Sequence, residues 1–433
     1  MSMSRISEII NELNNLPNGY ISYKTIKNKK YSYFQYVENG KLKSRYIKES
    51  DLPAIINKLN RRKELEEELK QLQSSGKNMP QLVKNTKNLT GYIMMEDTKV
   101  ASFENGELVS LSSELCPLLI NRTHNLSRFL ACRAIDKTRT NARLLKKVLQ
   151  IKETDDSFVS LYSYGATITD NYWFKPKYSK LKYRDISFEG DFYSDLALTG
   201  ELIVFPRTPK LTPQLTTPGS YEKCWKKIGD KWWLYKRGNE NEIYSELFCS
   251  LLAQKMNIPT AVYEHEGNCI RTLNFADKYN FEPISSIALD DDSYENVFSC
   301  ILNVSSDCAK EYLLLVWFDC LVNNVDRHNE NCGLLRSKKS GKIISLAPNF
   351  DNNLALISRG EILNMDAKND GFIKMFVSFL KSNAKAYELY KEIKLPKLTR
   401  KMVQDCFDQI DIKKDEDMIM NYIMNRYEVL SKL

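Results

Sequence analysis

The chain has 433 residues, of which 42% are hydrophobic and 27% charged, which indicates a soluble protein with a substantial core and about two to four domains. It has no apolar run approaching the roughly 18 residues of a membrane-spanning helix and no apolar signal stretch at its N-terminus, so we expect a cytoplasmic protein without a membrane partner. The net charge is +8, and residues 1–75 contribute 14 Lys and Arg against 9 Asp and Glu, an excess that suits either a polyanionic partner or only a solvated face.

The first 75 residues have the pattern of a small module built as helix, three strands and helix. Asn39-Gly40 is a strong signal for a tight hairpin between the second and third strands. The predicted elements are a helix over 4–16, strands over 20–26, 31–37 and 41–47, and a helix over about 51–73. A polar stretch over 76–88 has the composition of a linker.

Tyrosines alternate with Lys and Arg across the predicted strands of this module. Basic and aromatic residues on a small sheet can bind nucleic acid. The same pattern also fits a half-buried sheet that carries lysines on its outer face for solubility, and no base-reading motif is present. The residues leave both interpretations open.

The region after residue 89 has a mixed, α+β pattern. It contains predicted strands over 91–95, 100–103 and 108–111 and helical patterns over roughly 126–150. We find no catalytic constellation before residue 216, so any chemistry is expected in the second half of the chain.

A glycine-bearing loop, Thr216-Thr217-Pro218-Gly219-Ser220-Tyr221-Glu222-Lys223, precedes a predicted hairpin that turns at Gly229-Asp230. Such a loop can bring backbone N–H groups against phosphate oxygens, although any turn also favours glycine. Lys236 ends the second strand of the hairpin, where a protein kinase keeps the lysine that pairs with the ATP phosphates. The pattern therefore suggests a phosphate site.

A helix is predicted from Glu240 to about Met256. Glu242 and Glu246 lie one turn apart beside its apolar stripe, so either can form an ion pair with Lys236. The alternative is a pair of surface carboxylates on a solvated helix, which would contribute little.

The strongest pattern is the segment Asp326-Arg327-His328-Asn329-Glu330-Asn331, which follows an apolar helical run and precedes a hairpin that ends near Asp351. Phosphoryl transfer needs a carboxylate that receives the proton of the attacking hydroxyl, and an Asn and an Asp that hold metal ions. Asp326, Asn331 and Asp351 have that spacing and context. The spacing alone also fits an ordinary polar loop. The order of loop glycine, strand lysine, helix glutamate and these three residues is much more specific.

The chain resembles the HipA family, bacterial serine/threonine kinases that act as toxins of toxin–antitoxin pairs. The resemblance covers roughly residues 89–410 and is specific in the last two motifs. Glu246, twelve residues before Ile258-Pro259, matches the helix glutamate of the family better than Glu242 does. The similar motifs are Gly219, Glu222 and Lys223 of the phosphate loop, Asp326-x-His328-x-x-Asn331 of the catalytic loop, and Leu346-Ala347-Pro348-x-x-Asp351 of the metal-binding segment.

This resemblance implies an ATP- and Mg²⁺-dependent serine/threonine protein kinase of the α+β class, with a bilobal HipA-like fold. It implies an N-terminal lobe over 89–287 and a mostly helical C-terminal lobe over 288–433, preceded by the module of residues 1–75. A protein substrate with a Ser or Thr acceptor is expected. The expected partners also include an antitoxin, and nucleic acid bound by the antitoxin or by the module.

The same resemblance assigns roles to individual residues. It casts Asp326 as the base, Asn331 and Asp351 as metal ligands, and Lys236 on the ATP phosphates with Glu246. Ser220, Tyr221 and His328 join Gly219, Glu222 and Lys223 as expected ATP-binding residues, and 281–287 is the expected adenine hinge. Thr216, three residues before Gly219, stands at the family's inhibitory autophosphorylation position. The family usually has Ser there, and Gln where this chain has Tyr221.

Two other functions compete with this interpretation. The Asp-Arg-His-Asn-x-Asn motif also resembles the catalytic loop of phosphoinositide-type lipid kinases. A lipid kinase would be expected to have a basic cluster after the metal-binding Asp, but none follows Asp351. A kinase-shaped regulator without catalysis could act through residues 1–75. That alternative is disfavoured because Lys236, Asp326, Asn331 and Asp351 are all present.

Overall fold

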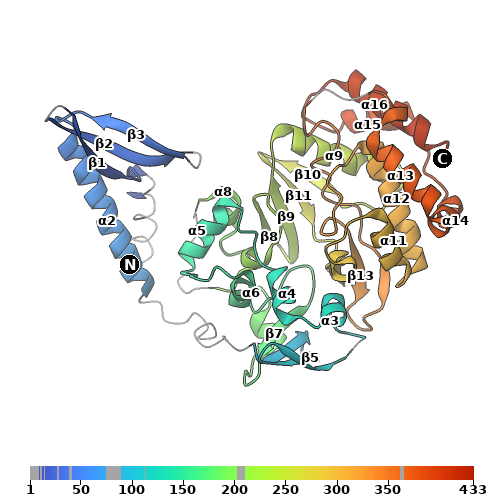
Figure 1. The fold of residues 1–433 in the computed structure, drawn as a ribbon, viewed down its shortest axis with the longest axis horizontal. Helices are drawn as coiled ribbons and strands as arrows, with labels where there is room; N and C mark the ends of the chain where they lie inside the picture. Colours follow the sequence, from blue (N-terminus) through green and yellow to red (C-terminus); the bar gives the residue numbers. More distant parts are fainter. Residues whose placement is uncertain are drawn as a thin grey trace. The chain divides into compact units, whose positions relative to one another are not determined.

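The computed structural model in Figure 1 describes residues 9, 12–13, 15–26, 29–38, 41–74, 89–112, 114–201, 210–360 and 365–433. The chain divides into two compact units. The first comprises Met1–Gln81 and Glu201–Lys210, and the second comprises Leu82–Gly200 and Leu211–Leu433. Across these described ranges, no helix is both long and apolar enough to cross a membrane.

The first unit contains an antiparallel sheet with the strand order β1-β2-β3. The strands are β1 (Tyr20–Ile26), β2 (Lys29–Glu38) and β3 (Lys41–Ile47), and the helix α2 (Leu52–Ser74) follows them. The three predicted strands are confirmed, with the second beginning two residues earlier than expected. The predicted helix over 4–16 lies largely outside the described residues. Arg62 of α2 donates to the carbonyls of Leu13 and Leu16, which ties the helix to the segment before the sheet.

The second unit begins with an antiparallel sheet in the order β6-β5-β4-β7. Its strands are β4 (Gly91–Met95), β5 (Thr98–Glu104), β6 (Glu107–Leu111) and β7 (Tyr172–Pro176). The helices α3 (Leu118–Thr123), α4 (Leu126–Ala131), α5 (Thr140–Val148) and α6 (Asp156–Ser160) and a 3-10 turn (Leu161–Ser163) follow β6. Ile93, Phe103, Phe129 and Phe174 are buried in one apolar cluster between sheet and helices.

A second antiparallel sheet, in the order β10-β11-β9-β8, carries the predicted phosphate loop and strand lysine. The short helices α7 (Tyr183–Ile186) and α8 (Ser194–Thr199) and a 3-10 turn (Pro213–Thr216) precede it. Its strands are β8 (Lys223–Ile228), β9 (Lys231–Arg237), β10 (Tyr263–Glu266) and β11 (Cys269–Leu273), and α9 (Glu240–Lys255) lies between β9 and β10 in sequence. Asn239 and Glu242 cap the start of α9 reciprocally, which fixes where that helix begins.

The rest of the chain is mainly helical around one small sheet of order β12-β13-β14 (Figure 1). The strands are β12 (Tyr279–Pro283), β13 (Gly333–Ser337) and β14 (Ile343–Leu346). The helices are α10 (Ser285–Ala288), α11 (Tyr294–Leu302), α12 (Ser306–Val322), α13 (Gly371–Ser382), α14 (Ala384–Glu392), α15 (Arg400–Phe407) and α16 (Glu416–Leu430), with a 3-10 turn at Ala367–Asn369. The predicted helical stretch over about 371–432 is confirmed.

The helix α12 is the centre of this helical part. It contacts α11, α13, α14 and α16, and most of its side chains are buried on every side. A helix that is apolar all round belongs inside a core rather than on its surface. Because α12 is held so firmly, the loop that leaves its C-terminal end starts from a fixed point.

Candidate active site

The loop between α12 and β13 carries Asp326 and Asn331. Asn323 ends α12 with a left-handed backbone, at φ 54°, and turns the chain out of the helix. The Asn331 side-chain amide donates to the Asp326 carbonyl over 3.0 Å and lies 3.4 Å from the Asp326 carboxylate. The Asp326 side chain is about a third exposed, and His328 Nε2 lies 3.9 Å from its carboxylate. The loop therefore presents a carboxylate, an amide and an imidazole together.

Arg327 lies between these residues in sequence but points into the protein. Its guanidinium forms a buried bidentate ion pair with Asp319 of α12, with both N–O distances at 2.9 Å. The same group donates to the Asn331 carbonyl over 2.5 Å and to the Phe350 carbonyl over 2.7 Å. One guanidinium therefore joins α12, the loop with Asn331 and the backbone next to Asp351. We read Arg327 only as part of the loop motif, and nothing in the sequence singled out Asp319.

Asp351 follows β14 with a left-handed backbone, at φ 60°. Its carboxylate forms an ion pair with the Lys236 ammonium of β9, and Glu246 of α9 lies 3.6 Å from the same ammonium. Lys236 and Glu246 are almost fully buried. The Glu246 carboxylate also accepts a hydrogen bond from the Asn352 backbone over 2.8 Å. The structure thus brings Lys236, Glu246 and Asp351 together from three different elements.

The charges of this group follow from burial and from each other. Burial alone would raise the pKa of Asp351, but Lys236, Lys223 and Arg327 outweigh it and lower that pKa to about 2. Burial raises the pKa of Glu246 despite the nearby lysine. The two carboxylates raise the pKa of Lys236 against the effect of burial. Asp351 and Lys236 are therefore both charged at neutral pH.

Glu242, the alternative partner of Lys236, has a different task. Its carboxylate caps the start of α9 through the Asn239 amide at 2.8 Å and accepts a hydrogen bond from the Tyr221 hydroxyl over 2.9 Å. The Lys236 ammonium lies 5.1 Å from the centre of the Tyr221 ring, so Tyr221 covers the lysine from the loop side.

The predicted phosphate loop lies over this lysine. Gly219 has φ 97°, a left-handed backbone that residues with a Cβ atom rarely adopt, so the position favours glycine. Burial lowers the pKa of Lys223 to about 7, although Asp351 opposes that shift. Ser220 is exposed at the tip of the loop. The Glu222 carboxylate instead accepts from the Asn141 backbone of α5 over 3.2 Å, so Glu222 points away from Lys236.

The Thr216 hydroxyl and two backbone amides of the expected adenine hinge already form hydrogen bonds within the protein. The Thr216 side chain is buried, and its hydroxyl donates to the Ala166 carbonyl over 2.6 Å. Two backbone amides of the expected hinge, those of Phe281 and Ile284, donate to carbonyls within the protein. In this conformation neither the hydroxyl nor these two amides are available to a nucleotide.

Arg139, in the region where we saw no chemistry, is the main residue that sequence reasoning missed. Its buried guanidinium donates to the carbonyls of Thr217, Pro218 and Gly219 over 2.5 to 2.8 Å, and to that of Lys223 over 3.3 Å. Four bonds from one planar cation fix the curve of the phosphate loop. Arg139 precedes α5 and stands about 80 residues before the loop, so no local pattern connects the two.

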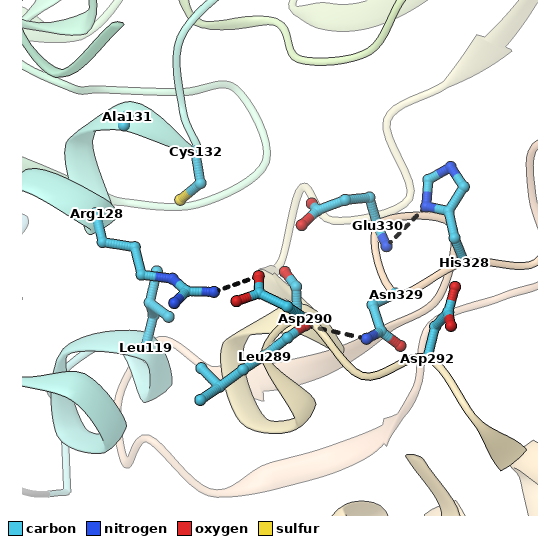
Figure 2. Close-up of a pocket in the computed structure, with 11 residues that line it drawn as sticks. Leu119, Arg128, Ala131, Cys132, Leu289, Asp290, Asp292, His328, Asn329 and Glu330 are labelled. Atoms are coloured by element: carbon cyan, nitrogen blue, oxygen red, sulfur yellow. Dashed lines mark hydrogen bonds and ion pairs between the residues drawn. The ribbon is translucent and has the colours of Figure 1, made fainter. Parts of the chain in front are cut away.

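A cavity of about 660 Å³ lies beside the loop that carries His328 and Asn329, and Figure 2 shows residues that line it. It lies between α4 and the segments that carry Asp290, Asp292 and His328. Arg128 of α4 forms an ion pair with Asp290 over 2.6 Å, and the Asn329 amide donates to the Leu289 carbonyl. The cavity borders the loop on the side of His328, Asn329 and Glu330.

The residues fit a magnesium–nucleotide pair. Mg²⁺ prefers hard oxygen ligands such as the ionised Asp351 carboxylate and the Asn331 amide oxygen. Arg327 holds the backbone of both ligand segments together, and Lys236 and Lys223 supply positive charge for phosphates. In the described part of the chain, no group of three or more His, Cys, Asp or Glu side chains forms a metal cluster of its own.

Comparisons with known proteins bear on the fold of the chain. A family model described as "Domain of unknown function (DUF6788)" matches residues 3–57, and no curated protein sequence matches the chain. A Shewanella oneidensis MR-1 toxin–antitoxin complex of HipA, HipB and operator DNA aligns with 79% of this chain and 97% of its own, at 11% identity and a TM-score of 0.50. The Helicobacter pylori proinflammatory kinase CtkA aligns with 48% of this chain and 90% of its own, at 16% identity and a TM-score of 0.38. The chain has a mixed α/β structure with a HipA-like kinase fold.

Proposed function

We propose that the second unit is a HipA-like serine/threonine protein kinase that transfers the γ-phosphate of ATP in a Mg²⁺-dependent reaction. The observation that carries the proposal is the convergence of Lys236, Glu246 and Asp351 from three separate elements. A strand lysine paired with a helix glutamate, facing a metal-binding aspartate, is the arrangement that phosphoryl transfer requires.

Each residue has a task in this reaction. Asp326 accepts the proton of the attacking hydroxyl, since its carboxylate is the partly exposed one in the catalytic loop. Asn331 and Asp351 hold Mg²⁺, which neutralises charge on the phosphates. Lys236, kept in place by Glu246, pairs with the phosphates, and the loop from Gly219 to Lys223 covers them. His328 stands beside Asp326 at the entrance.

The segment after Asp351 bears on which kind of molecule accepts the phosphate. A lipid kinase is expected to present a basic segment there. The residues Asn352, Asn353, Ala355 and Ile357 are instead fully or almost fully buried. This arrangement supports a protein hydroxyl as the acceptor. We extend the proposal to a toxin with an antitoxin partner because the structurally similar HipA was solved together with HipB and its operator DNA.

Autophosphorylation on Thr216 belongs to the same proposal. Because this hydroxyl is buried and bonded to Ala166, the turn at Pro213–Thr216 must open before the residue can accept a phosphate. A phosphate on Thr216 would not fit the closed position, so its addition would hold the loop open.

Intact-mass spectrometry of the purified protein, before and after incubation with Mg-ATP, tests the kinase proposal. We expect a gain of phosphate in the wild type and none in Asp326→Ala. The matched control is Asp408→Ala, which alters an exposed aspartate at the end of α15 and should behave as wild type. Peptide mapping then locates the phosphate. No gain, together with no ATP-dependent rise in Tm, would rule the proposal out. A rise in Tm without a gain would place the acceptor on another protein.

A further inference from the structure

The two faces of the sheet in the first unit carry different side chains. Phe34 and Ile47 are buried, and strand alternation places them on the same face. The opposite face carries Tyr20, Lys24, Lys29, Tyr31, Tyr33 and Tyr46, which we call the tyrosine face. The Tyr46 ring centre lies 6.2 Å from that of Tyr31 and 5.7 Å from that of Tyr33, which confirms that these rings share one surface.

The tyrosine face is open to solvent within its unit. Tyr20 is 57% exposed and Tyr46 is 51% exposed, and Lys24 and Lys29 are exposed as well. A tyrosine that serves a core is normally buried, with only its hydroxyl reaching a polar partner. Several half-exposed tyrosines on one small sheet therefore suggest a surface that a partner covers.

The charge of the sheet identifies the chemistry of that partner. Between residues 20 and 48 the sequence has eight Lys and Arg and a single acidic residue, Glu38. This segment therefore carries +7, whereas the entire chain carries +8. Strand register places Lys24 and Lys29 on the tyrosine face and Lys30, Lys43 and Arg45 on the face of Phe34. Both faces of this small sheet are therefore positive, which attracts a polyanion, and the phosphates of nucleic acid are the common one.

The ring contacts favour a duplex over a single strand. Single strands bind by stacking bases on free aromatic ring faces. Here the Lys24 ammonium lies 4.9 Å from the Tyr33 ring centre, and the Tyr46 ring is engaged by Tyr31 and Tyr33. These contacts leave fewer free ring faces for stacking, and the hydroxyl groups and the lysines are of the kinds that donate to phosphates.

The dimensions also fit the major groove of DNA. Strand spacings of about 4.8 Å put the outer strands of a three-stranded sheet about 10 Å apart. The major groove of B-form DNA is about 12 Å wide and admits β-strands, whereas that of A-form RNA is too narrow for side chains to read. We infer that the tyrosine face binds double-stranded DNA, with Lys24 and Lys29 on phosphates and the tyrosines at the groove.

Fluorescence anisotropy with the full-length chain tests this inference without ATP or Mg²⁺. The probe is a labelled mixed-sequence duplex of about 20 base pairs, compared with its separate strand, over a range of salt concentrations. The test variant is Lys24→Glu with Lys29→Glu. The matched control is Lys58→Glu with Lys63→Glu, which reverses two exposed lysines on α2 and changes the net charge equally.

We expect the wild type to bind the duplex more tightly than the single strand. The tyrosine-face variant should bind the duplex roughly tenfold more weakly, and the slope of log affinity against log salt should become shallower by about 2. The α2 variant should change either value little. Tyr20→Ala, which alters no charge, should weaken duplex binding while leaving the salt slope unchanged.

Three results would overturn the inference. These are no duplex binding by the wild type, equal losses in the two double variants, and single-strand binding as tight as duplex binding. Circular dichroism of each variant excludes loss of folding as the cause. Lys236→Ala, which removes a cation from the proposed kinase site, should leave duplex binding unchanged, so this experiment stands apart from the kinase proposal.

Discussion

Lys236 faces two carboxylates with one positive charge. Asp351 stays ionised because its pKa is about 2, whereas burial raises the pKa of Glu246. The lysine therefore stabilises the charged form of Asp351, and Glu246 holds the lysine in place. In the absence of nucleotide, this ion pair compensates the buried charge of Asp351, which would otherwise destabilise the fold.

Substitutions of the two aspartates of the proposed kinase site, Asp326 and Asp351, should have different effects. Asp326→Asn should retain the rise in Tm caused by Mg-ATP, because the Asp326 carboxylate lies beside His328 and Asn331 and is not in the ion pairs of Lys236, but it should lose phosphate transfer by at least about a hundredfold. Asp351→Asn should lose both transfer and the Mg²⁺-dependent part of the rise in Tm. Scanning fluorimetry and a phosphate-transfer assay on both variants measure this split. Identical behaviour of the two would contradict the assigned roles.

In the proposed kinase, we expect Lys223 to make ATP binding dependent on pH. Its pKa is lowered from 10.5 to about 7 by burial, so the lysine is charged below pH 7 and loses its proton above it. As a lysine with a lowered pKa, it destabilises the fold most at low pH, and this cost disappears as the pH rises from about 7 towards 10.5. Phosphate binding has the opposite preference, since it needs the charged form.

We therefore expect ATP affinity to fall as the pH rises above about 7, approaching tenfold per pH unit, and ATP binding to take up a proton near pH 8. Titration calorimetry in buffers of different ionisation enthalpy measures both quantities. Lys223→Arg stays charged throughout and should flatten the profile. A wild-type affinity that does not change between about pH 7 and pH 9 would contradict the role of Lys223.

At the scale of elements, Arg139 connects the start of α5 to the phosphate loop through four carbonyl groups. Arg139→Met should leave these carbonyls without a donor and let the loop lose its curve. We expect an ATP affinity lower by roughly tenfold and a free energy of unfolding lower by about 2 kcal/mol. Hydrogen exchange should become faster at the amides of residues 217–223. Arg143→Met, on the exposed face of α5, is the control and should change none of these values.

Arg327 holds the loop of Asp326 and Asn331 through backbone carbonyls, as Arg139 holds the phosphate loop. Its partner Asp319 is buried, so Asp319→Asn leaves a buried cation with weakened compensation. We expect a loss of about 3 kcal/mol in the free energy of unfolding, measured by urea denaturation. Asp307→Asn, exposed in the first turn of the same helix, should cost less than about 1 kcal/mol. Equal losses in the free energy of unfolding for both variants would contradict a stabilising role of the Asp319–Arg327 ion pair.

Local sequence patterns predicted several elements of the fold but not the contacts of Arg139 and Arg327. The strands of the first unit and the helices after residue 371 follow local patterns of turns and apolar residues, and they were predictable. That Asp326, Asn331 and Asp351 form one site stays a prediction, which rests on the order of the motifs rather than on spacing alone. Arg139 and Asp319 act through contacts across the fold, and a lone Arg or Asp has no local signature. The burial of Thr216 depends on Ala166, 50 residues earlier, and was equally hidden.

At the scale of the whole molecule, the proposed activities belong to separate units. Lys236, Glu246, Asp326, Asn331 and Asp351 all lie in the second unit, whereas the tyrosine face lies in the first. The DUF6788 match also falls within the first unit. The chain therefore combines a HipA-like kinase fold with a first unit that a separate family model matches in part, and no residue of the proposed kinase site comes from that unit.

A chain that begins at residue 89 tests this separation. We expect it to keep the rise in Tm caused by Mg-ATP and at least about half of the phosphate transfer, because every residue proposed to touch ATP, the metal ion or the acceptor is retained. It should lose binding to duplex DNA. The same truncated chain with Asp326→Ala is the control that separates transfer from contamination. If the truncated chain is folded by circular dichroism but no longer responds to ATP, the first unit takes part in the kinase site. Retained activity would instead exclude a regulator that works only through residues 1–75, since such a protein would have no chemistry left to keep.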